Sequence, residues 1–158
     1  MALLPILLHP DPRLSQPCDP VGEPDDAIRQ LAADMLETMY HATGRGLAAP
    51  QVGVMLRLFV MDLEWKHGFP APQVIIDPVI ELASDDLAVH TERCLSIPDQ
   101  PRAVSRPAEV RMRWTLPSGQ VRSSVFTGFA AVCVQHELDH LDGRLILDHP
   151  PAPSTTAE

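Results

Sequence analysis

The sequence has few basic residues and no cluster of them. Its 12 lysines and arginines are outnumbered by 21 acidic residues, which leaves a formal net charge of −9. A nucleic-acid surface needs clustered positive charge to neutralise phosphates. We therefore expect no direct binding to nucleic acid, and the acidic balance indicates mainly that the protein is soluble.

Long hydrophobic runs are also missing. No stretch of the sequence approaches the roughly 18 apolar residues that a membrane-spanning helix needs. The apolar start of the chain has no basic region before it and no cleavage site of small residues after it, and Pro5 interrupts it. We therefore expect no membrane partner and a cytoplasmic location.

Cysteine is scarce in this chain. Cys18, Cys94 and Cys133 are the three cysteines, and an odd number this small excludes a disulfide framework. We expect all three thiols to be reduced. A cysteine thiolate is therefore available as a metal ligand.

The length and composition are those of one globular domain. The chain has 158 residues, of which 45% are hydrophobic, and this is enough for a single core. We expect one domain over residues 1–149. Residues 150–158 read PPAPSTTAE, and this proline-rich composition predicts a disordered tail.

The sequence predicts two helices. In residues 24–44 the apolar positions recur at intervals of three and four, acidic residues stand at the start, and Gly44 lies past the end. A second helix is expected to begin after Thr127 and to end at Gly143.

Several strands are predicted between and after these helices. β-branched residues and alternation indicate strands at residues 57–63, 74–82 and 144–149, and a hairpin with strands 109–116 and 120–126. The glycine-bounded residues 44–53 are expected to form a loop, and the segment around Cys94 has neither a strand nor a helix pattern. Helices set among antiparallel strands indicate an α+β fold.

The second helix carries the pattern HExxH at His136, Glu137 and His140. On a helix this spacing places the two imidazoles one turn apart on one face, where both can bind one metal ion. Apolar neighbours such as Phe129 and Leu141 indicate that this face lies in or beside the core. We therefore favour a metal site over a pair of core histidines.

A metal site of this kind needs a third ligand from elsewhere. The longer zinc-protease pattern fails because Ile146 stands where that pattern requires histidine. Glu158 ends the proline-rich tail and is a poor candidate for a rigid ligand. Cys133 lies on the same helix but about 10 Å along its axis from His140, so we expect a small buried hydrophobe there.

The two remaining cysteines differ in their surroundings. Cys18 lies among prolines without polar companions, whereas Cys94 lies in TERCLSIPDQ beside Glu92 and Ser96. By elimination, Cys94 and the two histidines are the predicted ligands. The fourth position would hold water, which is typical of a catalytic rather than a structural metal site.

Three stretches together resemble the peptide deformylase family: GRGLAAPQ at residues 44–51, ERCLS at residues 92–96 and QHELDHLDG at residues 135–143. Their order and spacing match that family, and the resemblance covers nearly all of the chain before the tail. It implies antiparallel strands packed around a central helix that bears HExxH, with an N-terminal amphipathic helix. It also implies an enzyme that removes the formyl group from the N-terminal methionine of nascent proteins, with Fe²⁺ held by one cysteine and two histidines.

The resemblance assigns further roles by position. Glu137 would be the general acid and base, the side-chain amide of Gln51 would donate to the substrate oxygen, and the backbone N–H of Leu95 would be the second donor. A metal lowers the pKa of its bound water, so that hydroxide can attack the formyl carbon while Glu137 passes the proton to the departing amine. Zn²⁺ or another divalent metal could replace Fe²⁺, because Zn²⁺ normally binds such ligands more tightly.

The expected partner is an N-formyl-methionyl peptide. Where the family has an aliphatic residue and a glycine beside the peptide groove, this chain has two arginines. The residues expected to bind substrate are Arg45, Gly46, Arg93, Phe129 and Cys133. A transient association with the ribosome stays open, although the tail offers no basic surface for ribosomal RNA.

The two arginines also raise alternatives. A deformylase-like paralogue could hydrolyse another small N-acyl compound whose carboxylate Arg45 and Arg93 bind. A catalytically idle metal-binding protein is a further alternative, but a silent scaffold has no physical need for a general base beside an open metal position.

The resemblance suggests, in addition, that Glu92 pairs with Arg106 to hold the cysteine segment; the alternative is an unpaired surface carboxylate.

Overall fold

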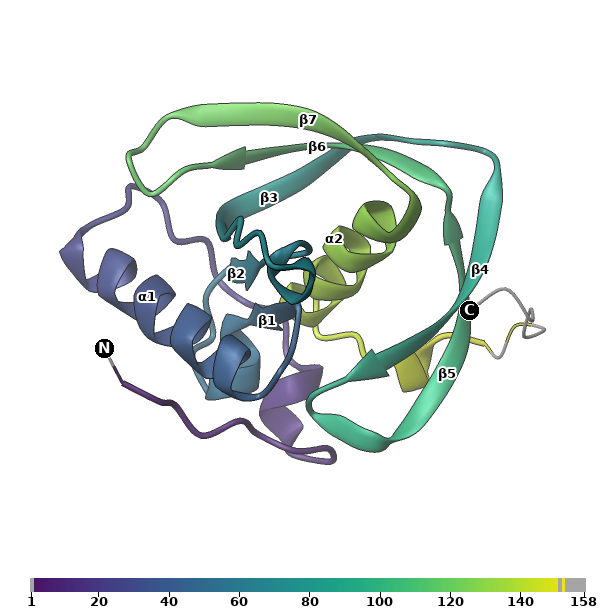
Figure 1. The fold of residues 1–158 in the computed structure, drawn as a ribbon, viewed down its shortest axis with the longest axis horizontal. Coiled ribbons are helices and arrows are strands. Elements are labelled where there is room, and N and C mark those ends of the chain that lie inside the picture. The colour runs from purple at the N-terminus through teal and green to yellow at the C-terminus, as the bar shows by residue number, and fades with distance from the viewer. Residues whose placement is uncertain (1, 151, 153–158) are drawn as a thin grey trace.

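A five-stranded antiparallel sheet and a separate two-stranded ribbon enclose the helix that bears the HExxH pattern (Figure 1). The structure is a computed structural model, and it describes residues 2–150 and 152. The larger sheet has the strand order β1-β2-β3-β6-β7, and β4 pairs with β5 in the ribbon. This α+β arrangement agrees with the fold class predicted from the sequence.

Two α-helices stand near the two ends of the chain, and the strands lie between them. The elements are η1 (Pro12–Ser15), α1 (Asp26–His41), β1 (Gly46–Ala48), η2 (Ala49–Val52), β2 (Leu58–Met61), η3 (Trp65–His67), β3 (Gln73–Ala83), β4 (Leu87–Cys94), β5 (Ile97–Pro107), β6 (Glu109–Thr115), β7 (Val121–Thr127), α2 (Gly128–Leu141) and η4 (Ile146–Asp148), where η denotes a 3₁₀ turn.

Helix α1 confirms the first predicted helix. The carboxylate of Asp25 accepts the backbone N–H of Ile28 at 2.9 Å and so satisfies one of the free donors at the helix start. The apolar stripe of Ala32, Met35 and Met39 is buried. It packs on one face of β1 and β2, because these residues share a core cluster with the strands.

Strand β2 is buried on both faces, and this places the two helices on opposite sides of it. Leu58 and Val60 belong to the cluster around α1, whereas Phe59 and Met61 belong to the cluster around α2. Successive side chains of a strand point to opposite faces, so this division follows from the pleat. The strand confirms the prediction for residues 57–63.

Helix α2 confirms the second predicted helix and both of its ends. Thr127 is the N-terminal cap, and Gly143 lies beyond the last turn with φ +76°. A side chain at Gly143 would also come within 2.9 Å of the backbone of Ser15. Glycine is therefore required there both by the left-handed backbone and by the close approach of the N-terminal segment.

The β6–β7 hairpin is also confirmed. Its strands pair from Glu109↔Thr127 to Thr115↔Val121, and the N–H of Leu116 bonds to the carbonyl of Gln120 at 2.7 Å across the turn. Val110, Met112 and Trp114 alternate inward from β6 and pack beside α2. This alternation is the pattern from which the hairpin was predicted.

The predicted strand at residues 144–149 is wrong. Residues Ile146–Asp148 form a 3₁₀ turn instead. The carboxylate of Asp148 accepts the backbone N–H of Leu145 at 2.8 Å and closes the turn locally, which competes with an extended conformation. Leu145 and Ile146 are buried in the cluster that includes Cys94. The apolar residues that suggested a strand therefore pack in the core although they lie in or beside a turn.

Two further segments differ from the prediction. The expected loop at residues 44–53 contains β1, which pairs with β2, and the turn η2. The segment around Cys94 is the end of β4, and the long β4–β5 ribbon was not predicted. The predicted tail lies outside the described residues except for Pro150 and Ala152.

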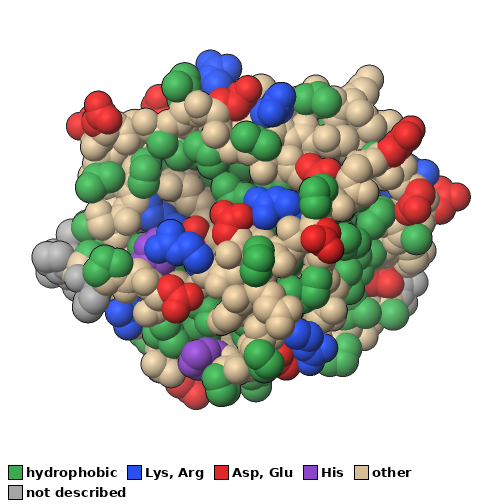
Figure 2. Space-filling view, turned by 180° about the vertical axis from the view of Figure 1, so that it is seen from behind, with side chains coloured by type: hydrophobic (Ala, Val, Ile, Leu, Met, Phe, Trp, Pro, Cys, Tyr) green, Lys and Arg blue, Asp and Glu red, His purple; other side chains and the backbone are tan. Residues whose placement is uncertain are grey.

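The surface away from the view of Figure 1 carries both kinds of charge. Figure 2 shows acidic and basic side chains interspersed on that face among hydrophobic and neutral ones. No helix within residues 2–150 is long and apolar enough to cross a membrane.

Candidate active site

One cysteine and two histidines meet beside α2. Cys94 stands at the end of β4, and His136 and His140 project from α2 one turn apart. One ligand atom from each of the three lies within 4.8 Å of the other two, and the sulfur of Cys94 is 3.4 Å from Nε2 of His140. The structure therefore brings together the three residues that the sequence selected as ligands.

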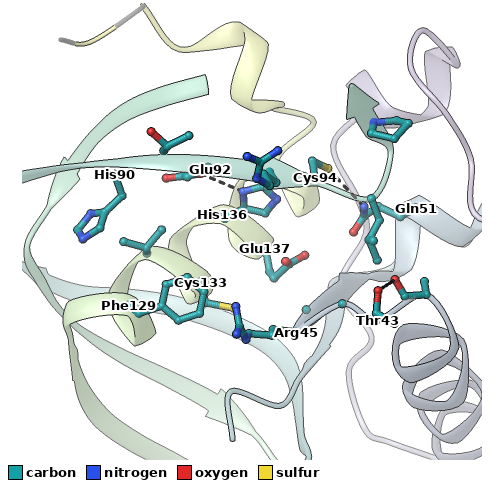
Figure 3. Close-up of a pocket in the computed structure, with 18 of the residues that line it drawn as sticks. Thr43, Arg45, Gln51, His90, Glu92, Cys94, Phe129, Cys133, His136 and Glu137 are labelled. Atoms are coloured by element: carbon teal, nitrogen blue, oxygen red, sulfur yellow. Dashed lines mark hydrogen bonds and ion pairs between the residues drawn. The ribbon is translucent and has the colours of Figure 1, made fainter. Parts of the chain in front are cut away.

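A buried ion-pair network fixes the orientation of His136. Its Nδ1 lies 2.9 Å from a carboxylate oxygen of Glu92 (Figure 3). Glu92 in turn accepts two bonds from Arg106, at 2.6 and 2.8 Å, and Arg106 also donates to Asp139 at 2.9 Å. A proton held on Nδ1 leaves Nε2 of His136 free as a ligand atom. The suggested pairing of Glu92 with Arg106 is thus present, and Glu92 is buried.

The donor atoms fit a divalent metal ion. A thiolate and two imidazoles are the ligand types that Zn²⁺ and Fe²⁺ accept. Burial lowers the pKa of His140 well below its ordinary value, and this favours the neutral form that binds a metal. Nδ1 of His140 has no hydrogen-bond partner among the described residues, and its Nε2 faces the sulfur of Cys94.

Glu137 lies at the base of the pocket next to these ligands (Figure 3). It follows His136 on α2, its side chain is buried, and its Oε1 has no partner among the described residues. Burial raises the pKa of Glu137 to about 7. A carboxyl group with a pKa near neutrality can both accept and return a proton, which suits general acid and base chemistry.

Gly46 gives Glu137 the space that it occupies. A β-carbon placed on Gly46 would lie 2.5 Å from Oε2 of Glu137 and 3.0 Å from its Cδ. Gly46 starts β1 and its φ is not in the left-handed region, so the close approach alone requires glycine. Strand β1 and helix α2 can approach closely at this point because the side chain is missing.

The amide of Gln51 is oriented by its neighbours. Its oxygen accepts the backbone N–H of Ala48 at 2.9 Å. Its nitrogen therefore faces the site, 3.1 Å from the hydroxyl of Ser96 and 3.6 Å from the sulfur of Cys94. Leu95 lies between those two residues and lines the same pocket. The two predicted donors thus lie beside Cys94, one of the three predicted metal ligands.

The pocket above these groups has a volume of about 640 Å³. All five residues that were expected to bind substrate line it: Arg45, Gly46, Arg93, Phe129 and Cys133. Phe129 is half exposed, and the guanidinium carbon of Arg45 lies 5.4 Å from the centre of its ring. Burial raises the pKa of Cys133 well above its ordinary value, so this thiol is a neutral, apolar part of the wall.

Sequence reasoning missed other residues of the pocket. His90 and Lys66 line it, and Ser96 orients Gln51. His90 shares a strand face with Glu92 and Cys94 through alternation, so a correct prediction of β4 would have found it. Lys66 reaches the pocket from the turn η3, in the loop between β2 and β3, and no local pattern signals that position.

Asp62 holds the loop that carries Lys66. This fully buried carboxylate accepts the hydroxyl of Tyr40 at 2.6 Å and the backbone N–H groups of Glu64, Trp65 and Ala71 at 2.9 to 3.0 Å. Burial raises the pKa of Asp62, but these four donors outweigh it and the pKa lies below its ordinary value.

The same loop also holds the pocket wall. The indole N–H of Trp65 donates to the carbonyl of Gly44 at 3.0 Å, and the N–H of Asp62 donates to the carbonyl of Arg45 at 2.9 Å. The segment before β1 is therefore tied to the loop at two consecutive residues.

Known proteins match nearly the whole chain. The family model for polypeptide deformylase matches residues 3–155. A peptide deformylase of Afipia carboxidovorans is 48% identical over 149 residues, which are 94% of this chain and 87% of the relative. The crystal structure of peptide deformylase from Thermotoga maritima has a TM-score of 0.89 and 35% identity, covering 96% of this chain and 99% of that one. A class I type b peptide deformylase from Acinetobacter baumannii with Met-Ala-Ser bound has a TM-score of 0.86 and 31% identity, covering 94% and 98%.

Proposed function

The chain belongs to the polypeptide deformylase family, and from this we propose that it hydrolyses the N-formyl group of peptides that begin with formylmethionine. The observation that carries the proposal is the meeting of Cys94, His136 and His140 at one point, where Cys94, His136 and the neighbouring Glu137 line one pocket. Formate and a peptide with a free amino terminus are the products.

Cys94, His136 and His140 would hold the metal ion. When bound, such an ion supplies Lewis acidity and a lowered pKa for water. We expect Fe²⁺, with Zn²⁺ or another divalent metal able to substitute, because all of them accept one thiolate and two imidazoles. Glu92 and Arg106 keep the ring of His136 in the orientation that exposes its Nε2.

Glu137 moves the proton. It takes a proton from the attacking water as the new C–O bond forms at the formyl carbon. It then delivers that proton to the amine nitrogen as the C–N bond breaks, so protons and charges balance over the reaction. The buried position, with one carboxylate oxygen unbonded among the described residues, leaves that oxygen free for this transfer.

Gln51 and Leu95 stabilise the negative charge that grows on the formyl oxygen. The Gln51 amide is held by Ala48 and Ser96 before substrate arrives, so its nitrogen would donate to the formyl oxygen with little reorganisation. The backbone N–H of Leu95 would be the other donor. Fixed donors of this kind contribute on the order of 100-fold each to the rate.

The pocket suits a methionine side chain behind the formyl group. Phe129, Val132 and Cys133 supply an apolar wall from α2. The relative from Acinetobacter baumannii was crystallised with Met-Ala-Ser, a peptide that begins with methionine. Formyl is the smallest acyl group, so a tight subsite beside Glu137 would admit it while excluding acetyl on steric grounds.

The comparisons support deformylase function and give no support to the paralogue with another N-acyl substrate or to the idle protein. A cytoplasmic location belongs to this proposal, because formylated nascent chains are made there. The transient association with the ribosome stays a prediction that rests on the resemblance.

Formate release tests the proposal. Protein loaded with Fe²⁺ under anaerobic conditions should release formate from formyl-Met-Ala-Ser and no acetate from acetyl-Met-Ala-Ser. Glu137→Ala should keep one metal per chain and lose roughly 100- to 10,000-fold in kcat, the usual contribution of a general acid and base. No formate from the fully loaded wild-type protein would reject the function.

A further inference from the structure

Three cations line the pocket without an ion-pair partner in the described part of the chain. Arg45 precedes β1, Lys66 lies in η3 and Arg93 lies in β4, so three separate segments converge on one opening. None of the ion pairs formed by the described residues involves any of the three. Their charges are therefore not neutralised by those residues.

The acidic groups of the pocket do not cancel these cations. The two carboxylates that line it are Glu92 and Glu137. Glu92 is bonded to Arg106 and His136, and Glu137 lies buried at the base. The outer part of the pocket is thus positive, although the chain as a whole carries a formal net charge of −9. Such a local inversion of charge attracts anionic groups to the opening.

Two of the cations are held in place. Arg45 is partly buried and lies over the ring of Phe129. Lys66 lies 5.5 Å from the ring of Trp65, whose indole N–H bonds to the carbonyl of Gly44. Cations that are already ordered lose less side-chain entropy when they bind an anion. Figure 3 shows Arg45 beside Phe129, on the side of the pocket that Glu137 faces.

From these contacts we infer that the enzyme prefers formylated peptides with aspartate or glutamate at one of the two positions after the methionine. The inference rests on the proposed function, because the formyl group must reach Glu137 while the rest of the peptide leaves through the opening. A side-chain carboxylate there would meet Arg93 and Lys66, which are exposed, and the guanidinium of Arg45. The arginines would thus select among peptides rather than change the chemistry.

Matched peptides test the preference. Formyl-Met-Glu-Ser-amide and formyl-Met-Ser-Glu-amide are each compared with the same peptide containing Gln, so that only the charge differs. The amide removes the terminal carboxylate. At low salt we expect kcat/KM to be roughly three- to tenfold higher for the Glu peptide at one of the positions, the effect of one or two exposed ion pairs. In about 0.5 M salt the ratio should approach one, because such pairs are screened.

Substitutions of the pocket cations test whether these side chains cause the preference for acidic peptides. The double change Lys66→Gln with Arg93→Gln should lower the Glu/Gln ratio towards one. Arg111→Gln is the matched control, because Arg111 is exposed on β6 and does not line the pocket. It removes a charge of the same sign and should leave the ratio unchanged.

The outcomes separate the two proposals. Equal rates for Glu and Gln peptides at both positions, with formate released from all, overturn the preference and leave deformylase function intact. A Glu/Gln ratio in the double variant that equals the wild-type ratio also overturns it. No formate from any peptide with full metal occupancy overturns the proposed function and the preference together.

Discussion

Gly46→Ala is expected to disable the enzyme without unfolding it. The new β-carbon would lie 2.5 Å from Oε2 of Glu137, whereas ordinary contact begins at 3.4 Å, so the carboxylate must move by about 0.9 Å, the difference of the two distances. A misplacement of about 1 Å in an active site costs on the order of 100-fold. The backbone of Gly46 has no left-handed φ, so alanine causes no strain of its own.

The assay is single-turnover formate release from formyl-Met-Ala-Ser, with metal content measured on the same sample. We expect the single-turnover rate constant to fall on the order of 100-fold or more, with one metal still bound and an unchanged circular dichroism spectrum. Gly44→Ala is the control, because its β-carbon would meet the end of the Leu95 side chain at 2.8 Å, which can rotate away. It should lose less activity. Near wild-type turnover of Gly46→Ala would refute the position or the role of Glu137.

Two further predictions concern the groups that support the site. Asp62→Asn should destabilise the protein by about 2–4 kcal/mol in denaturant titrations, because an amide cannot accept all four donors. The wild-type carboxylate stabilises the fold above its ordinary pKa of 3.8 and loses this effect as the pH falls through its lower folded value, so the variant should lose less stability on acidification. Arg106→Met leaves Glu92 buried without its main partner and should cost about 3–5 kcal/mol by calorimetry. It should also weaken metal binding roughly 10- to 100-fold in chelator competition, and unchanged affinity would contradict the role given to Glu92.

The parts of the fold that sequence predicted are those with a strong local signal. Helix α1 and strand β6 bury one face at regular intervals, so their residues alone indicate them. Helix α2 buries four successive residues, Ala131 to Val134, and it was predicted from the HExxH spacing and from the signals at its two ends. The β4–β5 ribbon lacks such a pattern. Its β5 strand contains Pro98, Pro101 and Pro107, and its burial alternates poorly, because it packs partly against the C-terminal segment and not against the larger sheet. Pairing with β4 therefore decides its conformation.

The residues of the candidate site also divide into those that a local pattern reveals and those that only the folded chain brings together. His136, Glu137 and His140 share one helix and were found from spacing, and Cys94 was found by excluding other ligands. The contribution of Lys66 depends on how the loop after β2 folds back onto Gly44, which Asp62 and Trp65 determine in three dimensions. No spacing rule relates these residues along the chain.

X-ray absorption spectroscopy of the zinc-loaded protein tests most directly whether Cys94 joins the two histidines around one ion. We expect one sulfur donor at about 2.3 Å together with nitrogen or oxygen donors at about 2.0–2.1 Å. The sulfur contribution should be missing from Cys94→Ala. A wild-type spectrum without sulfur would contradict the proposed metal centre.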